Sequence, residues 1–253
     1  MKTTWLQAEK DPMGAAIYDY FKNGKAGKLR VFSSQFEEDE IPVSELFRTY
    51  EHMPLLEQTA LDMAQGKILD VGAGSGCHSL ALKQMGKESV AIDISPLSVE
   101  VMQARGLDAR LVNLFDTHFA ERFDTILMLM NGSGIIGRVE NFGDFFQRMK
   151  LLLNPGGCIL MDSSDLRYLF EEEDGSFVVD LAGDYYGQLD FQMQYKQIKG
   201  EEMKKLAGTQ FLEQIMIEKV LNDKYEVSKE DVDAEFEEVK AQFGDEFQNA
   251  LKE

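Results

Sequence analysis

Two kinds of hydrophobic pattern alternate along the middle of the chain. From residue 67 to residue 162, short apolar runs rich in β-branched residues alternate with stretches of helical period. This alternation is typical of βαβ units, in which helices connect parallel strands. We expect strands at 67–71, 89–93, 110–112, 123–130 and 158–162, and helices at 77–85, 96–105 and 141–153. The pattern therefore predicts an α/β fold with a Rossmann-like, doubly wound, mostly parallel sheet.

The first 66 residues have a mainly helical pattern, interrupted by the polar stretch 33–42. Apolar side chains recur at helical spacing over 43–65, where Pro54 must bend or divide the helix. We expect residues 1–66 to form an N-terminal helical cap that lies over the mouth of the sheet. Plain packing helices are an equally good interpretation.

The part of the chain after residue 162 changes period twice. Residues 163–199 alternate with a period of two around Gly183, which predicts a hairpin excursion within a domain spanning 67–199. From residue 200 to residue 253 the pattern is again helical and acidic, which predicts a tail of two amphipathic helices. The apolar stripe of this tail needs a partner, so a homo-oligomer held together by the C-terminal helices is an open alternative.

The composition excludes several classes of function. The formal net charge of −19 disfavours nucleic acid as a partner, because an acidic protein gains nothing from counterion release. No apolar run is long enough to span a membrane, and no secretory leader is evident, so we expect a cytoplasmic protein without a membrane partner. The two cysteines, Cys77 and Cys158, and the three histidines lack ligand spacing, so we expect no metal, and we expect Cys158 in the core.

The sequence DVGAGSG, from Asp70 to Gly76, carries the main chemical signal. Its glycines allow a sharp bend from strand to helix and bring bare backbone close to a ligand. A dinucleotide fold needs a further glycine where Cys77 stands, so Cys77 and Asp70 disfavour an NAD-dependent oxidoreductase. Asp93 ends the second strand about twenty residues later, where a carboxylate can accept both hydroxyl groups of a ribose.

The bend resembles motif I of the class I S-adenosylmethionine-dependent methyltransferases, and the blocks between residues 66 and 162 are similar to that superfamily. The resemblance implies S-adenosylmethionine as cofactor and methyl transfer to a small-molecule acceptor. It assigns Asp70, Gly72 and Gly74 to the methionine portion, Asp93 to the ribose and the loop 113–116 to the adenine. The full set of cofactor-binding residues that it implies is Asp70, Gly72, Ala73, Gly74, Gly76, Asp93, Ile94, Asn113, Leu114, Asp116 and Asn131.

No catalytic acid or base follows from the sequence, because methyl transfer depends mainly on attack geometry. By resemblance, Asn131 and Gly132 lie where the acceptor meets the donor methyl group. The remaining candidates for an acid or base are Tyr50, His52, Tyr185 and Tyr186, although such side chains more often have packing roles.

The C-terminal end departs from the superfamily pattern. Class I methyltransferases usually finish with an antiparallel pair of strands, and no such pair is evident here. Residues 218–247 instead resemble the helical N-terminal segment of PrsA-type foldase lipoproteins, without their isomerase domain. We therefore expect a sheet that lacks its last two strands, and a chimera joined near Gly200. The alternative function is a catalytically impaired scaffold or helix-mediated interaction protein.

Overall fold

The computed structural model describes residues 5–164, 166, 169–171, 176 and 185–208. By its contacts the chain divides into two units, Met1–Thr209 and Gln210–Glu253. The predicted helical tail beyond residue 208 and the predicted turn at Gly183 lie outside the described residues. None of the described helices has the length and apolar character that crossing a membrane requires.

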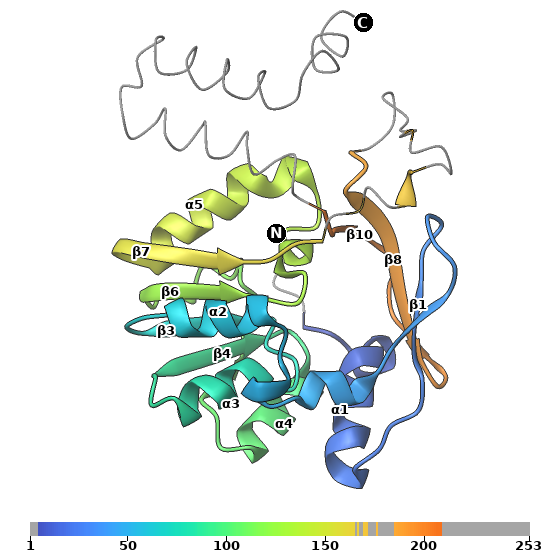
Figure 1. Cartoon of the computed structure of the whole chain (residues 1–253), viewed down its shortest axis with the longest axis horizontal. Coiled ribbons are helices and arrows are strands. Elements are labelled where there is room, and N and C mark those ends of the chain that lie inside the picture. The colour runs from blue at the N-terminus through green and yellow to red at the C-terminus, as the bar shows by residue number, and fades with distance from the viewer. Residues whose placement is uncertain (1–4, 165, 167–168, 172–175, 177–184, 209–253) are drawn as a thin grey trace, which may run out of the picture. The chain divides into compact units, whose positions relative to one another are not determined.

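A five-stranded parallel sheet forms the centre of the first unit (Figure 1). Its strand order is β5-β4-β3-β6-β7, so the chain winds outward in both directions from β3, as predicted. The strands are β3 (Ile68–Val71), β4 (Ser89–Asp93), β5 (Ala109–Leu111), β6 (Phe123–Met128) and β7 (Leu153–Met161). The Rossmann-like fold class is thereby confirmed. Within the described residues β7 is the last strand of the parallel sheet, and the antiparallel strands that follow it belong to a second sheet.

The three connecting helices are α3 (Cys77–Gln84), α4 (Pro96–Ala104) and α5 (Phe142–Leu152), within one or two residues of the predicted bounds. Helix α4 begins as expected, because the Ser95 hydroxyl accepts a hydrogen bond from the Ser98 N–H at 3.0 Å and Pro96 occupies the first turn. Gly106 ends the helix region with a positive φ of 77°.

The start of β7 corrects the sequence interpretation. The sequence predicts that this strand begins at residue 158, but β7 already begins at Leu153. Phe123 pairs with Leu153 and Thr125 pairs with Cys158, so the four residues between them bulge out of the ladder. Cys158 is exposed rather than in the core, because β7 is the edge strand of the described parallel sheet.

The N-terminal region is only partly helical, which corrects the predicted helical cap. Helix α1 (Pro12–Asn23) and helix α2 (Leu55–Met63) are present, and Pro54 immediately precedes α2, so the predicted division at this proline is confirmed. Between the two helices lie strands β1 (Leu29–Phe32) and β2 (Asp39–Ile41). Strand β1 pairs with β8 (Gln188–Tyr195), and a partner so distant in the sequence leaves no local signal.

A second, antiparallel sheet has the order β10-β8-β1-β2, with β9 (Ile198–Lys199) also paired to β8. Strand β10 (Met203–Leu206) corrects the helical pattern that was predicted from residue 200 onward. Figure 1 places this sheet beyond the arrowheads of the parallel strands, at their C-terminal ends. Two hydrogen bonds of 2.8 Å fix it there: Ser133 Oγ donates to Leu206 O, and Ser164 N donates to Ala207 O.

Candidate functional site

The bend between β3 and α3 has the backbone geometry that only glycine adopts easily. Gly72, Gly74 and Gly76 have φ values of 68°, 57° and 79°. A Cβ atom on Gly76 would lie 2.8 Å from the Cγ atom of Met102, so Gly76 also serves close packing. A Cβ atom on Gly74 would have no neighbour nearer than 3.7 Å. The bend therefore leaves bare backbone accessible at Gly74 while Gly76 is buried in the core.

Asp93, at the end of β4, lies directly against this bend. Its Oδ2 accepts a hydrogen bond from the Gly74 N–H at 2.9 Å, and its Oδ1 accepts one from the Ser95 N–H at 2.8 Å. Burial raises the pKa of Asp93 to about 6, and the backbone hydrogen bonds oppose that rise. The structure thus brings together the bend and the acid that the sequence analysis paired.

Asp70 lies beneath the bend rather than at its surface. Its side chain is buried, and its Oδ2 accepts a hydrogen bond from Ser79 Oγ at 2.6 Å. Burial raises the pKa of this carboxyl group, and the positive potential of His78 and the hydrogen bond from Ser79 oppose the effect. Asp70 therefore ties the end of β3 to helix α3 and supports the bend from below.

The loop 113–116 follows β5 at the same edge of the sheet. Within it, Asn113 Oδ1 accepts a hydrogen bond from the Phe115 N–H at 2.9 Å, and Leu114 is buried. Arg148 of α5 holds the loop from inside: its Nε donates to Leu114 O at 2.6 Å and its Nη2 to Asp116 O at 2.7 Å. The sequence analysis missed Arg148, although an arginine within the apolar stripe of α5 was a usable signal.

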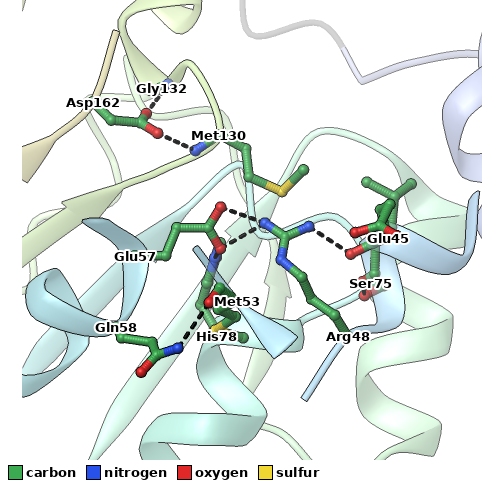
Figure 2. A network of polar contacts seen from close by, with 11 residues as sticks. Glu45, Arg48, Met53, Glu57, Gln58, Ser75, His78, Met130, Gly132 and Asp162 are labelled. Atoms are coloured by element: carbon green, nitrogen blue, oxygen red, sulfur yellow. Dashed lines mark hydrogen bonds and ion pairs between the residues drawn. The ribbon is translucent and has the colours of Figure 1, made fainter. Parts of the chain in front are cut away.

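The loop after β6 is strained and is held by an acid from the neighbouring strand. Met130 and Asn131 both have positive φ, 62° and 61°, which costs of order 1–3 kcal/mol per residue. Asp162, just after β7, accepts hydrogen bonds from the N–H groups of Met130 and Gly132, both at 3.0 Å (Figure 2). Ser164 Oγ donates to Asn131 Oδ1 at 2.7 Å. Asp162 was missed, although its place at a strand end was a visible signal.

A buried ionic cluster connects the N-terminal region to helix α3. Arg48 forms an ion pair with both carboxylate oxygens of Glu57, and His78 Nε2 lies 2.9 Å from Glu57 Oε2 (Figure 2). Burial raises the pKa of Glu57, but the hydrogen bonds from His78 and Arg48 outweigh it and hold that pKa below its ordinary value. His78 is therefore a structural side chain of this cluster, which could not be foreseen from the sequence.

The tyrosine and histidine candidates make contacts of their own. The Tyr50 hydroxyl donates to Asp62 Oδ1 at 2.9 Å on helix α2, and the exposed His52 has its Nδ1 at 2.9 Å from Thr49 Oγ1. These contacts direct both side chains toward the N-terminal segment rather than toward Asn131. The rings of Tyr185 and Tyr186 pack together, with centroids 4.8 Å apart, just before β8.

Cys77 is the first residue of α3 and is buried. Burial raises the pKa of its thiol to about 12, so Cys77 is not a thiolate nucleophile at neutral pH. Among the described residues, no group of three or more His, Cys, Asp or Glu side chains is placed to hold a metal ion.

Comparison with known proteins identifies the family. A family model described as a methyltransferase domain matches residues 68–157. The solved structure of an S-adenosylmethionine-dependent methyltransferase from Bacteroides fragilis, in complex with S-adenosyl-L-homocysteine, is 68% identical with a TM-score of 0.77. That match covers 83% of this chain and 86% of the other. The chain belongs to the class I S-adenosylmethionine-dependent methyltransferases, and S-adenosylmethionine is its cofactor.

Curated relatives match shorter stretches. Cypemycin N-terminal methyltransferase from a Streptomyces species is 28% identical over 102 residues, which are 39% of this chain and 42% of the relative. Foldase protein PrsA 2 from Listeria innocua is 49% identical over 51 residues, 20% of this chain. The chain spans only 18% of that foldase, so the predicted resemblance to PrsA is confirmed as a short partial one.

Proposed function

We propose that this protein transfers a methyl group from S-adenosylmethionine to a small-molecule acceptor at the C-terminal edge of the parallel sheet. The single observation that carries the proposal is the contact of the Asp93 carboxylate with the Gly74 N–H at the glycine bend. It joins the ends of two adjacent parallel strands, and ligands of open α/β sheets bind at this edge. Family membership supports the reaction, and the geometry supports the location.

In this proposal the cofactor lies across the bend with its ribose at Asp93. Each carboxylate oxygen of Asp93 accepts one backbone hydrogen bond, so lone pairs remain on both oxygens for two ribose hydroxyl groups. The accessible backbone of Gly72 and Gly74 suits the methionine portion, and Asp70 supports the bend beneath them. Ala73 and Gly76 complete this bend.

The adenine would occupy the adjoining edge, between Ile94 and the loop 113–116. Asn113 Oδ1 accepts a hydrogen bond from the Phe115 N–H within this loop, and Asp116 Oδ1 accepts one from the His118 N–H just after it. These bonds fix the loop backbone, so a purine edge would meet rigid peptide groups. Leu114, which is 3% exposed, anchors the loop in the core.

When bound, S-adenosylmethionine supplies an electrophilic methyl group on a sulfonium. The acceptor's lone pair would then displace the sulfur from this methyl group, and the acceptor's proton would go to water. The contribution of the protein is then to orient the acceptor. Asn131 suits this role, because Ser164 occupies its side-chain oxygen and leaves the amide N–H groups as donors. Asp162 fixes the backbone on both sides of Asn131.

A second candidate function rests on one specific observation. Within the described residues the parallel sheet ends at β7 and lacks a following antiparallel pair. A non-catalytic scaffold of the same fold would retain cofactor binding but would not transfer methyl groups. Turnover therefore separates the two functions, whereas cofactor binding alone does not.

The test uses S-adenosylmethionine labelled in the methyl group, incubated with the full chain and a small-molecule extract. We expect the label to appear in a small molecule that separates chromatographically from S-adenosylmethionine, together with free S-adenosylhomocysteine. An Asn131→Ala variant should reduce this transfer by a larger factor than it weakens cofactor binding. Label in macromolecules only would contradict the small-molecule acceptor, and cofactor binding without any transfer would favour the scaffold.

We also infer that the second unit, Gln210–Glu253, is a separate segment joined to the methyltransferase. The short similarity to the foldase supports a chimera. Because β10 still pairs with β8, we move the inferred junction from Gly200 to a point after Leu206. Association of two chains through this segment stays a prediction, which the mass in solution of the full chain and of a chain ending at residue 209 would test.

A further inference from the structure

Lys205 is a cation beside the strained loop that no step described so far uses. It lies on β10, next to Leu206, whose carbonyl oxygen accepts the hydrogen bond from Ser133 Oγ. Its aliphatic stem lies over Gly134 in the short helix η4 (Gly132–Ile135), so closely that a Cβ atom on Gly134 would overlap the Cε atom of the lysine. The stem is thus held in a slot that exists only because residue 134 is glycine.

The ammonium group of Lys205 has an aromatic neighbour, but no carboxylate of the described residues forms an ion pair with it. Its Nζ lies 4.6 Å from the centroid of the Phe191 ring, which is a favourable cation–π distance. Among the described residues, Asp162 is the one carboxylate whose attraction acts on this lysine. Both oxygens of Asp162 already accept backbone hydrogen bonds from Met130 and Gly132.

The environment makes this arrangement unusual for a surface lysine. Burial lowers the pKa of Lys205, and Asp162 only partly offsets that effect. Carboxylates are plentiful in this chain, whose net charge is −19. A partly buried lysine that pairs with none of the described carboxylates therefore lacks the stabilisation that an ion pair would give it. By contrast Lys67, Arg110 and Lys196 each form an ion pair with an acidic side chain.

We propose that Lys205 and Phe191 form the acceptor-recognition site, and that the acceptor is a small molecule carrying a carboxylate next to a flat apolar group. The carboxylate would pair with the Lys205 ammonium, and the flat group would lie against the Phe191 ring. This assignment rests on the proposed function, because it places the acceptor beside Asn131. Lys205 is a specificity-determining residue here and takes no part in bond making.

The contact with Gly134 in η4 explains how the side chain of Lys205 is held in one orientation. Because its stem is confined by Gly134 and its head lies over Phe191, few rotamers remain available to it. An ammonium group that is ordered before binding loses less conformational entropy when it pairs with an anion. The same confinement predicts that changes at Gly134 act on binding through Lys205.

The test measures binding of benzoate and of its neutral isostere benzamide to the full chain saturated with S-adenosylhomocysteine, by ligand-observed NMR. We expect the wild type to bind benzoate at least tenfold more tightly than benzamide. Lys205→Met keeps the stem and removes the charge, so it should weaken benzoate binding at least tenfold. Lys205→Arg should retain binding within about threefold.

Lys199→Met is the matched control, because Lys199 lies on the same sheet with its Nζ 6.0 Å from the Phe32 ring centroid and is exposed. It should leave benzoate binding unchanged. Should Lys205→Met fail to fold, Gly134→Ala is the second variant, and its Cβ should displace the lysine and weaken benzoate severalfold. Equal binding of benzamide, no binding of benzoate to the wild type, or unchanged binding by Lys205→Met would overturn the proposal. Calorimetry with S-adenosylhomocysteine on the same samples reports separately on the proposed function.

Discussion

The Asp93 carboxylate accepts a hydrogen bond from the Gly74 N–H at 2.9 Å, although 19 residues separate them in the chain. The contact joins the ends of β3 and β4 and places a half-buried acid at the proposed ribose position. Burial raises the pKa of this acid to about 6. The same side chain therefore links binding of the cofactor to the stability of the free protein.

The first prediction concerns pH. The pKa of Asp93 is about 6 in the folded protein, whereas its ordinary value is 3.8. Between pH 4 and pH 6 the Asp93 carboxyl group is therefore protonated in the folded protein and ionised in the unfolded chain. The contribution of Asp93 to stability is therefore full below pH 4 and declines until about pH 6. Relative to the wild type, Asp93→Asn should gain about 2–3 kcal/mol of unfolding free energy between pH 4 and pH 7.5.

Urea unfolding of both proteins without cofactor, at several pH values, measures this difference. Comparing the two proteins cancels the titration of the other carboxyl groups. A difference that does not change with pH would contradict the assigned cause of the shift. The variant should lose affinity for S-adenosylhomocysteine at every pH, because an amide cannot replace both acceptor oxygens.

The second prediction separates the roles of the glycines. Gly76→Ala should destabilise the fold by about 2–4 kcal/mol, since the methyl group combines positive φ with overlap on Met102. Gly74→Ala and Gly86→Ala have positive φ without such overlap, so each should cost about 1 kcal/mol. Thermal unfolding measures these effects. Of the latter two, only Gly74→Ala should also weaken cofactor binding, and equal affinities in the two would count against the proposed bend.

The third prediction concerns the buried ionic cluster. Glu57→Ala leaves Arg48 buried without its carboxylate, so unfolding free energy should fall by about 3–5 kcal/mol. Glu40→Ala is the control, because Glu40 pairs with Lys28 at the surface and should contribute less than about 1 kcal/mol. Urea unfolding compares them. Equal losses for the two variants would show that burial does not govern the strength of the pair.

The fourth prediction concerns Arg148. Arg148→Met fills similar space but leaves the carbonyl groups of Leu114 and Asp116 without their donor. We expect a loss of about 2–3 kcal/mol in stability and severalfold weaker binding of S-adenosylhomocysteine, because the loop 113–116 loses its anchor. Arg122→Met is the control, since Arg122 donates to Leu153 O from an exposed position. Unchanged cofactor affinity in Arg148→Met would argue against adenine binding at this loop.

The parallel sheet and its helices could be predicted from the sequence because their signals are local. Each of these signals is contained in a few consecutive residues: the five apolar runs, the Ser95 cap and the glycine bend. The pairing of Asp93 with the bend also follows, since the carboxyl ends of adjacent parallel strands meet at one edge. Strand β4 has the predicted bounds, whereas other strands differ by a residue or more, as β6 does, which ends at Met128 rather than at residue 130.

Strand β8 lies in the stretch whose period of two predicts an extended chain, but the antiparallel sheet as a whole could not be predicted, because the partners of β8 lie far along the chain. Leu29 pairs with Tyr195, and Lys205, in a stretch of helical period, pairs with Leu189. The same limit applies to the site. Arg148, Asp162 and Lys205 reach the edge of the sheet only after helix α5 and strands β7 and β10 are in place.

The most direct test of the glycine bend as the cofactor site is calorimetric titration of the full chain with S-adenosylhomocysteine. We expect one site per chain, an affinity reduced at least tenfold in Asp93→Ala, and no heat with NADH. Lys199→Met, far from the bend in sequence, should bind like the wild type. If the wild type does not bind S-adenosylhomocysteine, or if Asp93→Ala binds it with the same affinity as the wild type, the cofactor does not bind at the glycine bend as proposed.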